Sequence, residues 1–371
     1  MYTDTAVMDF TLDPAQEALA ETAAKAMERE RNDGIVRRLA DDPVGVDAAS
    51  WRTVVDLGWT GLLVDGAHGG AGGGLLDACI VVEQAGRVPL PGPLFSSAIC
   101  ATLAARALGA GDLLPSLAAG TTRGTLAIAE QGHGDPLRTV ATRARRKGNR
   151  WLVTGTKPLV LDACSADWAI VVAGTEEGPR CFLVDPVEAE AVPTLDPTRK
   201  AGRLHLVDRP ATPLGPDGSH AELVRSVQDD IAVALGAENL GVAERALEIA
   251  TAYTKERVVF GRPVASFQVV KHKIVDMLHL VEMARVGVQF AAWAADTDDL
   301  ARARAAAMAA GYASEAAVKV AGEALQLHGG VGFTWDCDAH FLLKRAKQND
   351  VLTGGHATQR RRLATMLVDT V

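Results

Sequence analysis

The chain has 371 residues, 48% of them hydrophobic, which is enough for two or three domains with a large core. Its formal net charge of −8 argues against nucleic acid as a partner. No uninterrupted apolar run approaches the ~20 residues of a membrane span, and no basic stretch followed by an apolar one marks a secretory signal.

The cysteines and histidines indicate neither disulfides nor a metal site. The five cysteines are odd in number, scattered and without metal-ligand spacing, so we predict free thiols in a reducing cytoplasm. His328, His340 and His356 share no metal spacing with a third ligand and are expected to be structural or exposed to solvent.

Residues 1–120 are predicted to form a helical domain. Asp13 followed by Pro14 is a typical helix start, with the aspartate as cap and the proline in the first turn. The stretch from Gly69 to Gly74 is the richest in glycine, and no Lys-Ser/Thr follows it, which excludes a phosphate-binding P-loop. We expect this loop to approach another backbone or a ligand closely.

Residues 121–218 change from a helical period to a period of two. Short β-prone runs alternate with turn residues and predict a small antiparallel barrel or sandwich. The basic stretch 143–150 contains Gly148-Asn149 and is expected to be a solvated hairpin tip. The predicted strands are Thr125–Ala129, Val140–Arg146, Trp151–Val153, Ala169–Val172, Cys181–Val184 and Leu204–Val207.

Residues 219–371 follow a linker rich in proline and glycine and predict four or five helices, as in a bundle. An alanine-rich helix is expected at roughly 299–327, with small side chains that allow close helix approach. Asp338 is a candidate cap for the next helix. Gly354-Gly355 should break the chain before a last helix that ends near Asp369.

The stretch that joins the first two helices of this part predicts a helix end, a tight corner and a new helix start. Gly261 can adopt a positive φ, and Pro263 cannot continue a helix. Such a corner would hold Arg257 and Phe260 in place, as a charged, aromatic ligand such as a dinucleotide requires. The alternative is a plain corner whose Arg257 is solvated or paired with an acid. The stretch reads Tyr253-Thr-Lys-Glu-Arg257-Val-Val-Phe260-Gly261-Arg262-Pro263-Val-Ala-Ser-Phe267-Gln268.

This stretch closely resembles a signature of the acyl-CoA dehydrogenase family. A second stretch, which runs from Gln326 through His328-Gly329-Gly330 to Thr334, resembles the second signature of that family. The two occur in the family's order, and the resemblance extends over essentially the whole chain. It implies a mostly α fold with a central β domain: a helical domain (1–120), an antiparallel β domain (121–218) and a C-terminal bundle (219–371). The glycine-rich loop would help to close the acyl pocket.

The resemblance also implies FAD as cofactor and an acyl-CoA thioester as substrate. Family members transfer a hydride from Cβ to the flavin while a glutamate removes the Cα proton. They hold the adenine–pyrophosphate half of FAD across a subunit interface, where an arginine offsets the pyrophosphate charge and two glycines allow close backbone approach. For the glycines, a simple helix C-cap is the alternative. The matching residues are Arg257, Phe260, Gln268, Gln326, Gly329 and Gly330.

The rest of the family's site is not matched. A Thr-Glu-Pro-Gly-Ala-Gly-Ser-like loop is replaced by residues 129–135, Ala-Glu-Gln-Gly-His-Gly-Asp. Leu159 and Leu161 stand where the family offers Trp and Thr to the flavin ring.

The family's catalytic glutamate is missing as well. Thr353 occupies its usual position, and Ile231 occupies the position that carries the base in some relatives. Asp350 and Asp230 are weak candidates for a base. Asp229 is adjacent to Asp230, but one residue along a helix turns the side chain by about 100°.

The resemblance is therefore to the heteromeric bacterial subgroup, in which a chain of this kind pairs with a homologous subunit (α2β2) that carries the base and the flavin-ring contacts. That subgroup is associated with bulky or sterol-derived acyl-CoA, and an electron-transfer flavoprotein or similar acceptor is the implied redox partner. Two alternatives remain open: a self-sufficient homotetramer with an unrecognised base, and a flavin-free structural subunit.

Overall fold

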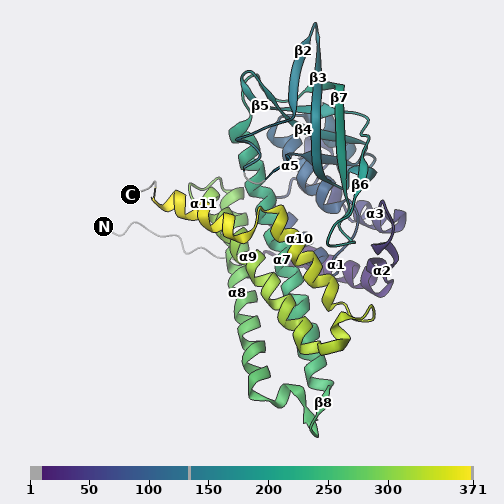
Figure 1. The fold of residues 1–371 in the computed structure, drawn as a ribbon, viewed down its shortest axis with the longest axis vertical. Coiled ribbons are helices and arrows are strands. Elements are labelled where there is room, and N and C mark those ends of the chain that lie inside the picture. The colour runs from purple at the N-terminus through teal and green to yellow at the C-terminus, as the bar shows by residue number, and fades with distance from the viewer. Residues whose placement is uncertain (1–10, 133–134, 369–371) are drawn as a thin grey trace.

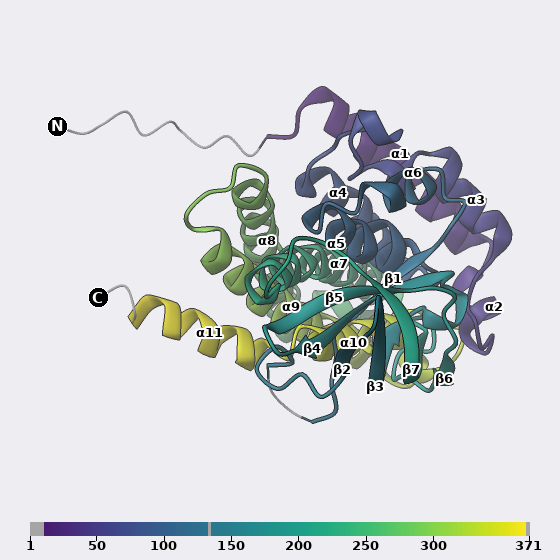
Figure 2. The same cartoon turned by 90° about the horizontal axis from the view of Figure 1, so that it is seen from above.

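The computed structural model describes residues 11–132 and 135–368. It consists of an N-terminal helical part, a central β-sheet and a C-terminal bundle of long helices (Figure 1). Seen from above, α7 lies between the N-terminal helices on one side and α8 and α9 on the other (Figure 2). Across the described ranges, no helix combines the length and apolar character needed to cross a bilayer.

The N-terminal part begins as predicted, because the Asp13 carboxylate accepts hydrogen bonds from Ala15 N (2.8 Å) and Gln16 N (2.9 Å) and caps the first helix. Its last elements include a π-helical segment, η3. The helices are α1 (Pro14–Asn32), α2 (Ile35–Ala40), α3 (Ala48–Asp56), η1 (Trp59–Gly61), η2 (Gly66–His68), α4 (Leu75–Gly86), η3 (Leu94–Ala101), α5 (Thr102–Ala107), η4 (Gly111–Leu113) and α6 (Leu114–Ala118).

The glycine-rich loop packs against another backbone segment, as the sequence predicted. Gly72 N donates to Val64 O at 2.7 Å, and Gly73 N donates to Leu62 O at 2.8 Å. A Cβ on Gly70 would overlap Val64 O. At the end of the loop the Asp296 carboxylate of α8 accepts from Leu75 N at 2.6 Å, so it caps α4 from the other helical part.

The central part is a seven-stranded sheet with the order β1-β4-β2-β3-β7-β5, and β6 pairs with β7. The basic hairpin tip is confirmed, since Lys147 pairs with Arg150 across it. The sheet is not purely antiparallel, because β1 pairs in parallel with β4. In the chain these two strands are separated by the β2–β3 hairpin. The strands are β1 (Gly124–Ala127), β2 (Arg143–Lys147), β3 (Arg150–Leu161), β4 (Trp168–Thr175), β5 (Gly178–Val184), β6 (Glu190–Val192) and β7 (Ala201–Pro213), with the short helix η5 (Ala163–Ser165) after β3.

The C-terminal part is built from α-helices. In the described residues these are α7 (Ala221–Glu256), α8 (Gln268–Asp296), α9 (Arg302–His328), α10 (Ala339–Leu352) and α11 (His356–Val368). The break at Gly354-Gly355 is confirmed, with positive φ at both residues. Asp338 lies at the N-cap of α10, but its side chain makes no cap bond and pairs with Arg37 instead at 2.8 Å. The end of α11 predicted near Asp369 lies outside the described residues.

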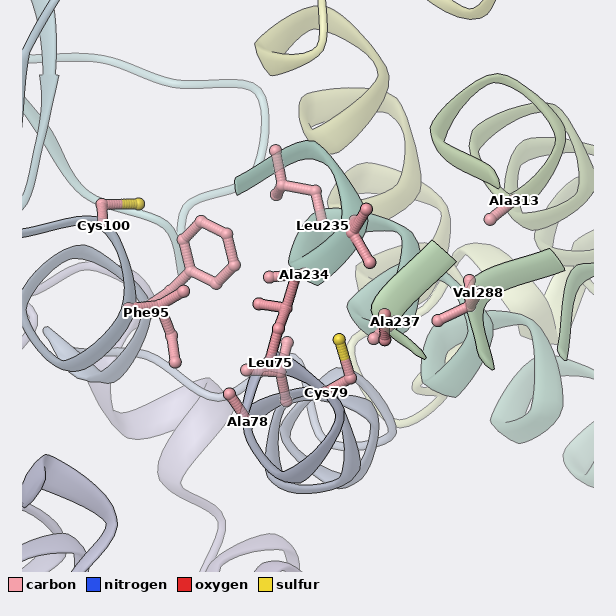
Figure 3. Packing of buried hydrophobic residues seen from close by; sticks show 14 of the residues in the cluster. Leu75, Ala78, Cys79, Phe95, Cys100, Ala234, Leu235, Ala237, Val288 and Ala313 are labelled. Atoms are coloured by element: carbon pink, nitrogen blue, oxygen red, sulfur yellow. The ribbon is translucent and has the colours of Figure 1, made fainter. Parts of the chain in front are cut away.

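Two glycines set the distance between α4 and α7. A Cβ on Gly86 would overlap Glu238 O, and a Cβ on Gly241 would overlap Glu83 O. The two helices therefore touch backbone to backbone. Beside this crossing, apolar side chains from α4, η3 and α7, among them Phe95 and Leu235, fill the space (Figure 3).

One arginine joins all three parts. Arg345 of α10 is completely buried, and its guanidinium donates to Asp196 and Thr198 before β7, to Glu238 of α7, and to the carbonyl oxygens that precede η3. Because every branch of the guanidinium has an acceptor, the buried charge is compensated. This contact fixes the β-sheet and both helical parts relative to one another.

Candidate functional site

The corner after α7 is a two-residue hairpin. β8 (Val258–Val259) pairs with β9 (Arg262–Pro263), and Phe260 and Gly261 form the turn with φ of 53° and 77°. The turn requires positive φ at both positions, which explains the glycine. A short helix, η6 (Val264–Ser266), then leads into α8, so the predicted corner is confirmed. Arg257 is the C-cap residue of α7.

The second motif ends α9 at the same end of the bundle. The rings of Tyr253 on α7 and His328 on α9 stack with centroids 4.5 Å apart, which ties the two motifs together. Gly329 caps α9 with a φ of 60°, and the turn η7 (Gly329–Phe333) follows. Both motifs lie at the end of the bundle remote from the β-sheet, near β8 in Figure 1.

The residues matched to the adenine–pyrophosphate site are exposed at this end. Phe260 is 91% exposed, and Gln268 and Gln326 also face solvent. Arg257 is exposed and has no ion pair within the ranges that the structure describes. A Cβ on Gly329 or Gly330 would have nothing within 4 Å, so their backbone is open to an approaching group. The C-cap alternative also holds for Gly329, since its N–H donates to Gln326 O.

This surface combines a free cation, exposed aromatic rings and open backbone, which suits a ligand with a phosphate and a flat ring. The six matched residues therefore fit the adenine–pyrophosphate half of FAD. The sequence did not predict how apolar the surface around these six residues is. About half or more of each of four further apolar side chains is exposed there, namely Val258, Val331, Phe333 and Trp335. Their alternation after the glycines, at 331, 333 and 335, was the available signal. The ring of Trp335 contacts those of His340 and Phe341.

The candidate bases are all occupied by structural contacts. Asp230 receives two hydrogen bonds from Arg302, at 2.8 and 2.7 Å, and burial raises its pKa while Arg302 opposes the rise. Asp229, on the neighbouring face of α7, pairs with Arg362 of α11. Ile231 packs against the main apolar core.

The turn between α10 and α11 offers no free base either. Asp350 accepts from Ser314 Oγ at 2.8 Å and from His356 N at 2.7 Å, so it caps α11. The Thr353 hydroxyl donates to Asp350 O at 2.9 Å. These residues stabilise the turn.

Where the family contacts the flavin ring, this chain has a buried ion pair and apolar side chains. Lys157 of β3 donates to Glu130 at 2.8 Å, and burial lowers the pKa of this lysine. Leu161 is partly buried against the main core. The middle of the replaced loop, residues 133–134, lies outside the described residues.

The two best-defined hollows in the described parts of the chain are both far smaller than an acyl chain. Their volumes are about 10 and 20 Å³, while one water needs about 10–15 Å³. Neither is lined by residues of the two motifs. Nor does any group of three potential metal ligands occur in the described ranges.

Comparison with known proteins covers nearly all of the chain. Three family models match: acyl-CoA dehydrogenase, N-terminal domain (13–121), middle domain (125–206) and C-terminal domain (229–368). The acyl-CoA dehydrogenase IpdE2 of Mycolicibacterium smegmatis is 31% identical, over 94% of this chain and 97% of its own length.

Two solved structures share the fold over their whole length. A variant of the Tcur3481–Tcur3483 steroid ACAD has a TM-score of 0.88 at 32% identity and covers 97% of this chain and 99% of its own. A chain of the ChsE4–ChsE5 complex from Mycobacterium tuberculosis has a TM-score of 0.87 at 28% identity and covers 98% of this chain and all of its own (100%).

Proposed function

This chain belongs to the acyl-CoA dehydrogenase family, and on that premise we propose that it is the subunit without a catalytic base in a heteromeric, FAD-dependent acyl-CoA dehydrogenase. One observation carries the proposal. The six residues matched to the adenine–pyrophosphate site are exposed. Thr353 holds the position of the base, and the carboxylates of Asp230, Asp229 and Asp350 are bound to structural partners.

In such an assembly the chain would complete a site whose reacting part belongs to the homologous subunit. Arg257 would neutralise pyrophosphate charge through its forked donors, and the open backbone at Gly329 and Gly330 would let the cofactor approach. Phe260 would cover the adenine from one side. A bound FAD supplies the acceptor for the hydride that leaves Cβ of the acyl chain.

The chain's own residues argue against a second reacting centre. Removal of the weakly acidic Cα proton needs a positioned carboxylate in a dry pocket, and a threonine hydroxyl cannot accept it.

For the substrate we propose a bulky, sterol-derived acyl-CoA. The support comes from relatives: one similar structure is a steroid ACAD, and another belongs to a complex of two differently named chains, ChsE4 and ChsE5. By the same analogy we propose an electron-transfer flavoprotein or similar acceptor as redox partner. The free thiols of all five cysteines support a cytoplasmic location.

The test is turnover of the complex between this chain and a homologous chain that carries an acid at the position of Thr353 or Ile231. We expect Thr353→Ala, Asp350→Asn and Asp230→Asn to retain most of the activity per assembled complex. Replacing the acid of the homologous chain should lower turnover by about 100- to 10,000-fold, the usual contribution of a general base.

The Asp350→Asn and Asp230→Asn variants should lose some stability, because they weaken the cap of α11 and the pair with Arg302. Activity is therefore compared at equal flavin content and equal assembly. A hundredfold loss in any of the three variants under these conditions would show that this chain carries the base, as in a self-sufficient enzyme.

A further inference from the structure

The hairpin formed by β2 and β3 carries a dense run of positive charge. Five of the eight residues from Arg143 to Arg150 are basic, and none is acidic. Since the whole chain has a formal net charge of −8, the chain without these five cations has a net charge of −13. The hairpin projects at the end of the molecule remote from β8, and so from the proposed cofactor site (Figure 1).

The strand register places four of these cations on one face of the hairpin. Ala144 packs into the core of the sheet. Because side chains alternate along a strand, Arg143, Arg145 and Lys147 point to the other side. Arg150 shares that side, because it pairs directly with Lys147. All four side chains are exposed, and we call them together the basic face.

The charge of the basic face is not neutralised within the chain. Arg145 pairs with Asp208 of β7 at 3.0 Å. The other three cations form no ion pair in the ranges that the structure describes. Arg143 adjoins β4, and the turn after that strand carries Glu176 and Glu177, but neither of them pairs with the face. The face therefore keeps an excess of positive charge.

The fold does not benefit from this arrangement. Lys147 and Arg150 lie directly opposite each other, and like charges in that position destabilise a sheet. Charges also hinder an open strand edge from pairing with another chain, and β2 is open along most of one side because it pairs with β4 only at Arg143. That role does not account for the charge on β3, which lies between β2 and β7. A partner outside the chain accounts for both strands.

An exposed apolar side chain lies beside the basic face. Val207 of β7 is 83% exposed. The next residue, Asp208, binds Arg145 and accepts from Thr154 Oγ1 at 3.0 Å, and Thr154 stands opposite Arg143. A small apolar contact with a charged rim suits a weak, transient protein–protein interface, the class to which redox encounters belong.

We propose that the basic face docks an acidic surface of the protein that accepts electrons from the complex, an inference that rests on the proposed function. Opposite charges speed such brief encounters by steering the partners together. A small ligand would need a hollow, and neither of the two best-defined hollows is lined by hairpin residues. The negative charge of the rest of the chain disfavours nucleic acid. The turn at Gly148 and Asn149 has no large apolar side chain to insert into a membrane.

The experiment measures turnover of the complex between this chain and its homologous subunit with two acceptors, an electron-transfer flavoprotein and the small dye phenazine methosulfate. The variant combines Lys147→Gln with Arg150→Gln, which removes a repulsion and should not impair folding. We expect kcat/KM for the flavoprotein to fall by about tenfold at low salt, with turnover on the dye unchanged. At about 1 M salt, which screens charges beyond about 3 Å, the variant and the unmodified complex should have equal kcat/KM.

The matched control combines Arg29→Gln with Arg52→Gln. It removes two exposed cations of α1 and α3 that form no ion pair in the described ranges, so kcat/KM for the flavoprotein should stay unchanged. An equal fall in this control would show an effect of net charge alone and would overturn the proposal. So would an unchanged kcat/KM in the hairpin variant, or turnover of the unmodified complex with the dye only. No turnover with either acceptor would overturn the proposed function, and the docking proposal with it.

Other occupants of the basic face would give different results with the same hairpin variant. A raised KM for acyl-CoA, measured with the dye, would assign the face to the substrate. Dissociation of the complex in sedimentation would assign it to a neighbouring subunit. Binding of the unmodified complex to vesicles that contain phosphatidylserine, lost in the variant, would assign it to a membrane. Each of these three results overturns the proposal.

Discussion

At the scale of single residues, Arg257 carries the most specific expectation. It is exposed, without an ion pair among the described residues, and lies one helical turn after Tyr253, whose ring stacks on His328 just before Gly329 and Gly330. We predict that Arg257→Ala weakens FAD binding by the assembly about tenfold, because a forked, charge-assisted contact to pyrophosphate is lost. Flavin content after equilibration at low FAD measures this.

Lys255→Ala is the control for that experiment. Lys255 is an exposed cation in the last turn of α7, so the variant removes the same charge two residues away from Arg257, at a position that is not among the six matched residues. It should leave flavin content unchanged. Equal FAD affinity in the Arg257→Ala variant and in the unmodified assembly would remove Arg257 from the cofactor site.

Asp162 offers a prediction about pH. It is buried in a left-handed conformation (φ 49°), accepts from Ser96 Oγ at 2.7 Å, and burial raises its pKa to about 6. Stability from the bound proton is present at acid pH and is lost as pH rises from about 4 through about 6. Since Asn does not ionise and tolerates this φ, Asp162→Asn should gain roughly 3 kcal/mol over the unmodified chain between pH 4 and pH 7.

Urea unfolding at constant protein concentration, at each pH, measures the difference. Asp208→Asn is the matched control, because Asp208 is also left-handed (φ 46°) but exposed, and Thr154 and Arg145 lower its pKa. Asp208→Asn should lower stability near neutral pH, because it removes a carboxylate whose ionised form is held by these two partners. A difference between the Asp162→Asn variant and the unmodified chain that does not vary with pH would refute the account of Asp162.

Residue types in two motifs were enough to predict the corner after α7 and the end of α9 at Gly329, but not how the acids are used. Asp230 is bound by a residue 72 positions away, and Asp229 by one 133 positions away. Such pairs depend on helix packing and leave no local pattern. The Arg345 contact was missed for the same reason.

At the scale of elements, the breakers and caps predicted the start of α1, the corner between α7 and α8, and the break before α11. Pro14 lies in the first turn of α1, and Gly261, Gly354 and Gly355 have the positive φ that their turns require. The alanine-rich α9 lies within a few residues of its predicted range. The parallel pairing of β1 with β4 was not predictable, because strand order is decided by contacts across the whole sheet. The short β6 has no alternating pattern that could mark it.

The crossing of α4 and α7 gives the element-scale prediction. Gly241→Ala would drive a methyl group into Glu83 O, so we expect a loss of about 1–3 kcal/mol as the helices separate. Gly287→Ala on α8 meets only Ala309 at 3.9 Å and should gain about 0.5–1 kcal/mol from helix propensity. Chemical unfolding of both variants tests the pair, and equal effects would contradict the tight crossing.

At the scale of the whole molecule, apolar surface and the incomplete site both point to assembly. The outer face of α8 exposes a row of large apolar side chains, which a lone subunit would leave in water. We propose a dimer of dimers built through the C-terminal helices. The exposed residues of this face are Val269, Val275, Leu278, Met283 and Val286.

Sedimentation of the purified complex tests this assembly. We predict a stable tetramer at micromolar concentration, and a polar substitution on α8, such as Leu278→Glu, should dissociate it. Tyr312→Phe on α9, which keeps the packing of a partly buried ring, should not. A stable, active monomer would rule out the shared site.

The flavin content of this chain alone and with its homologous partner tests the central claim most directly. If the chain supplies half of a cofactor site and no reacting centre, the chain alone should bind little FAD. The complex should hold about one FAD for every two chains, as expected when one of two paired sites is complete. One tightly bound FAD per chain, with turnover in the chain purified alone, would contradict the account.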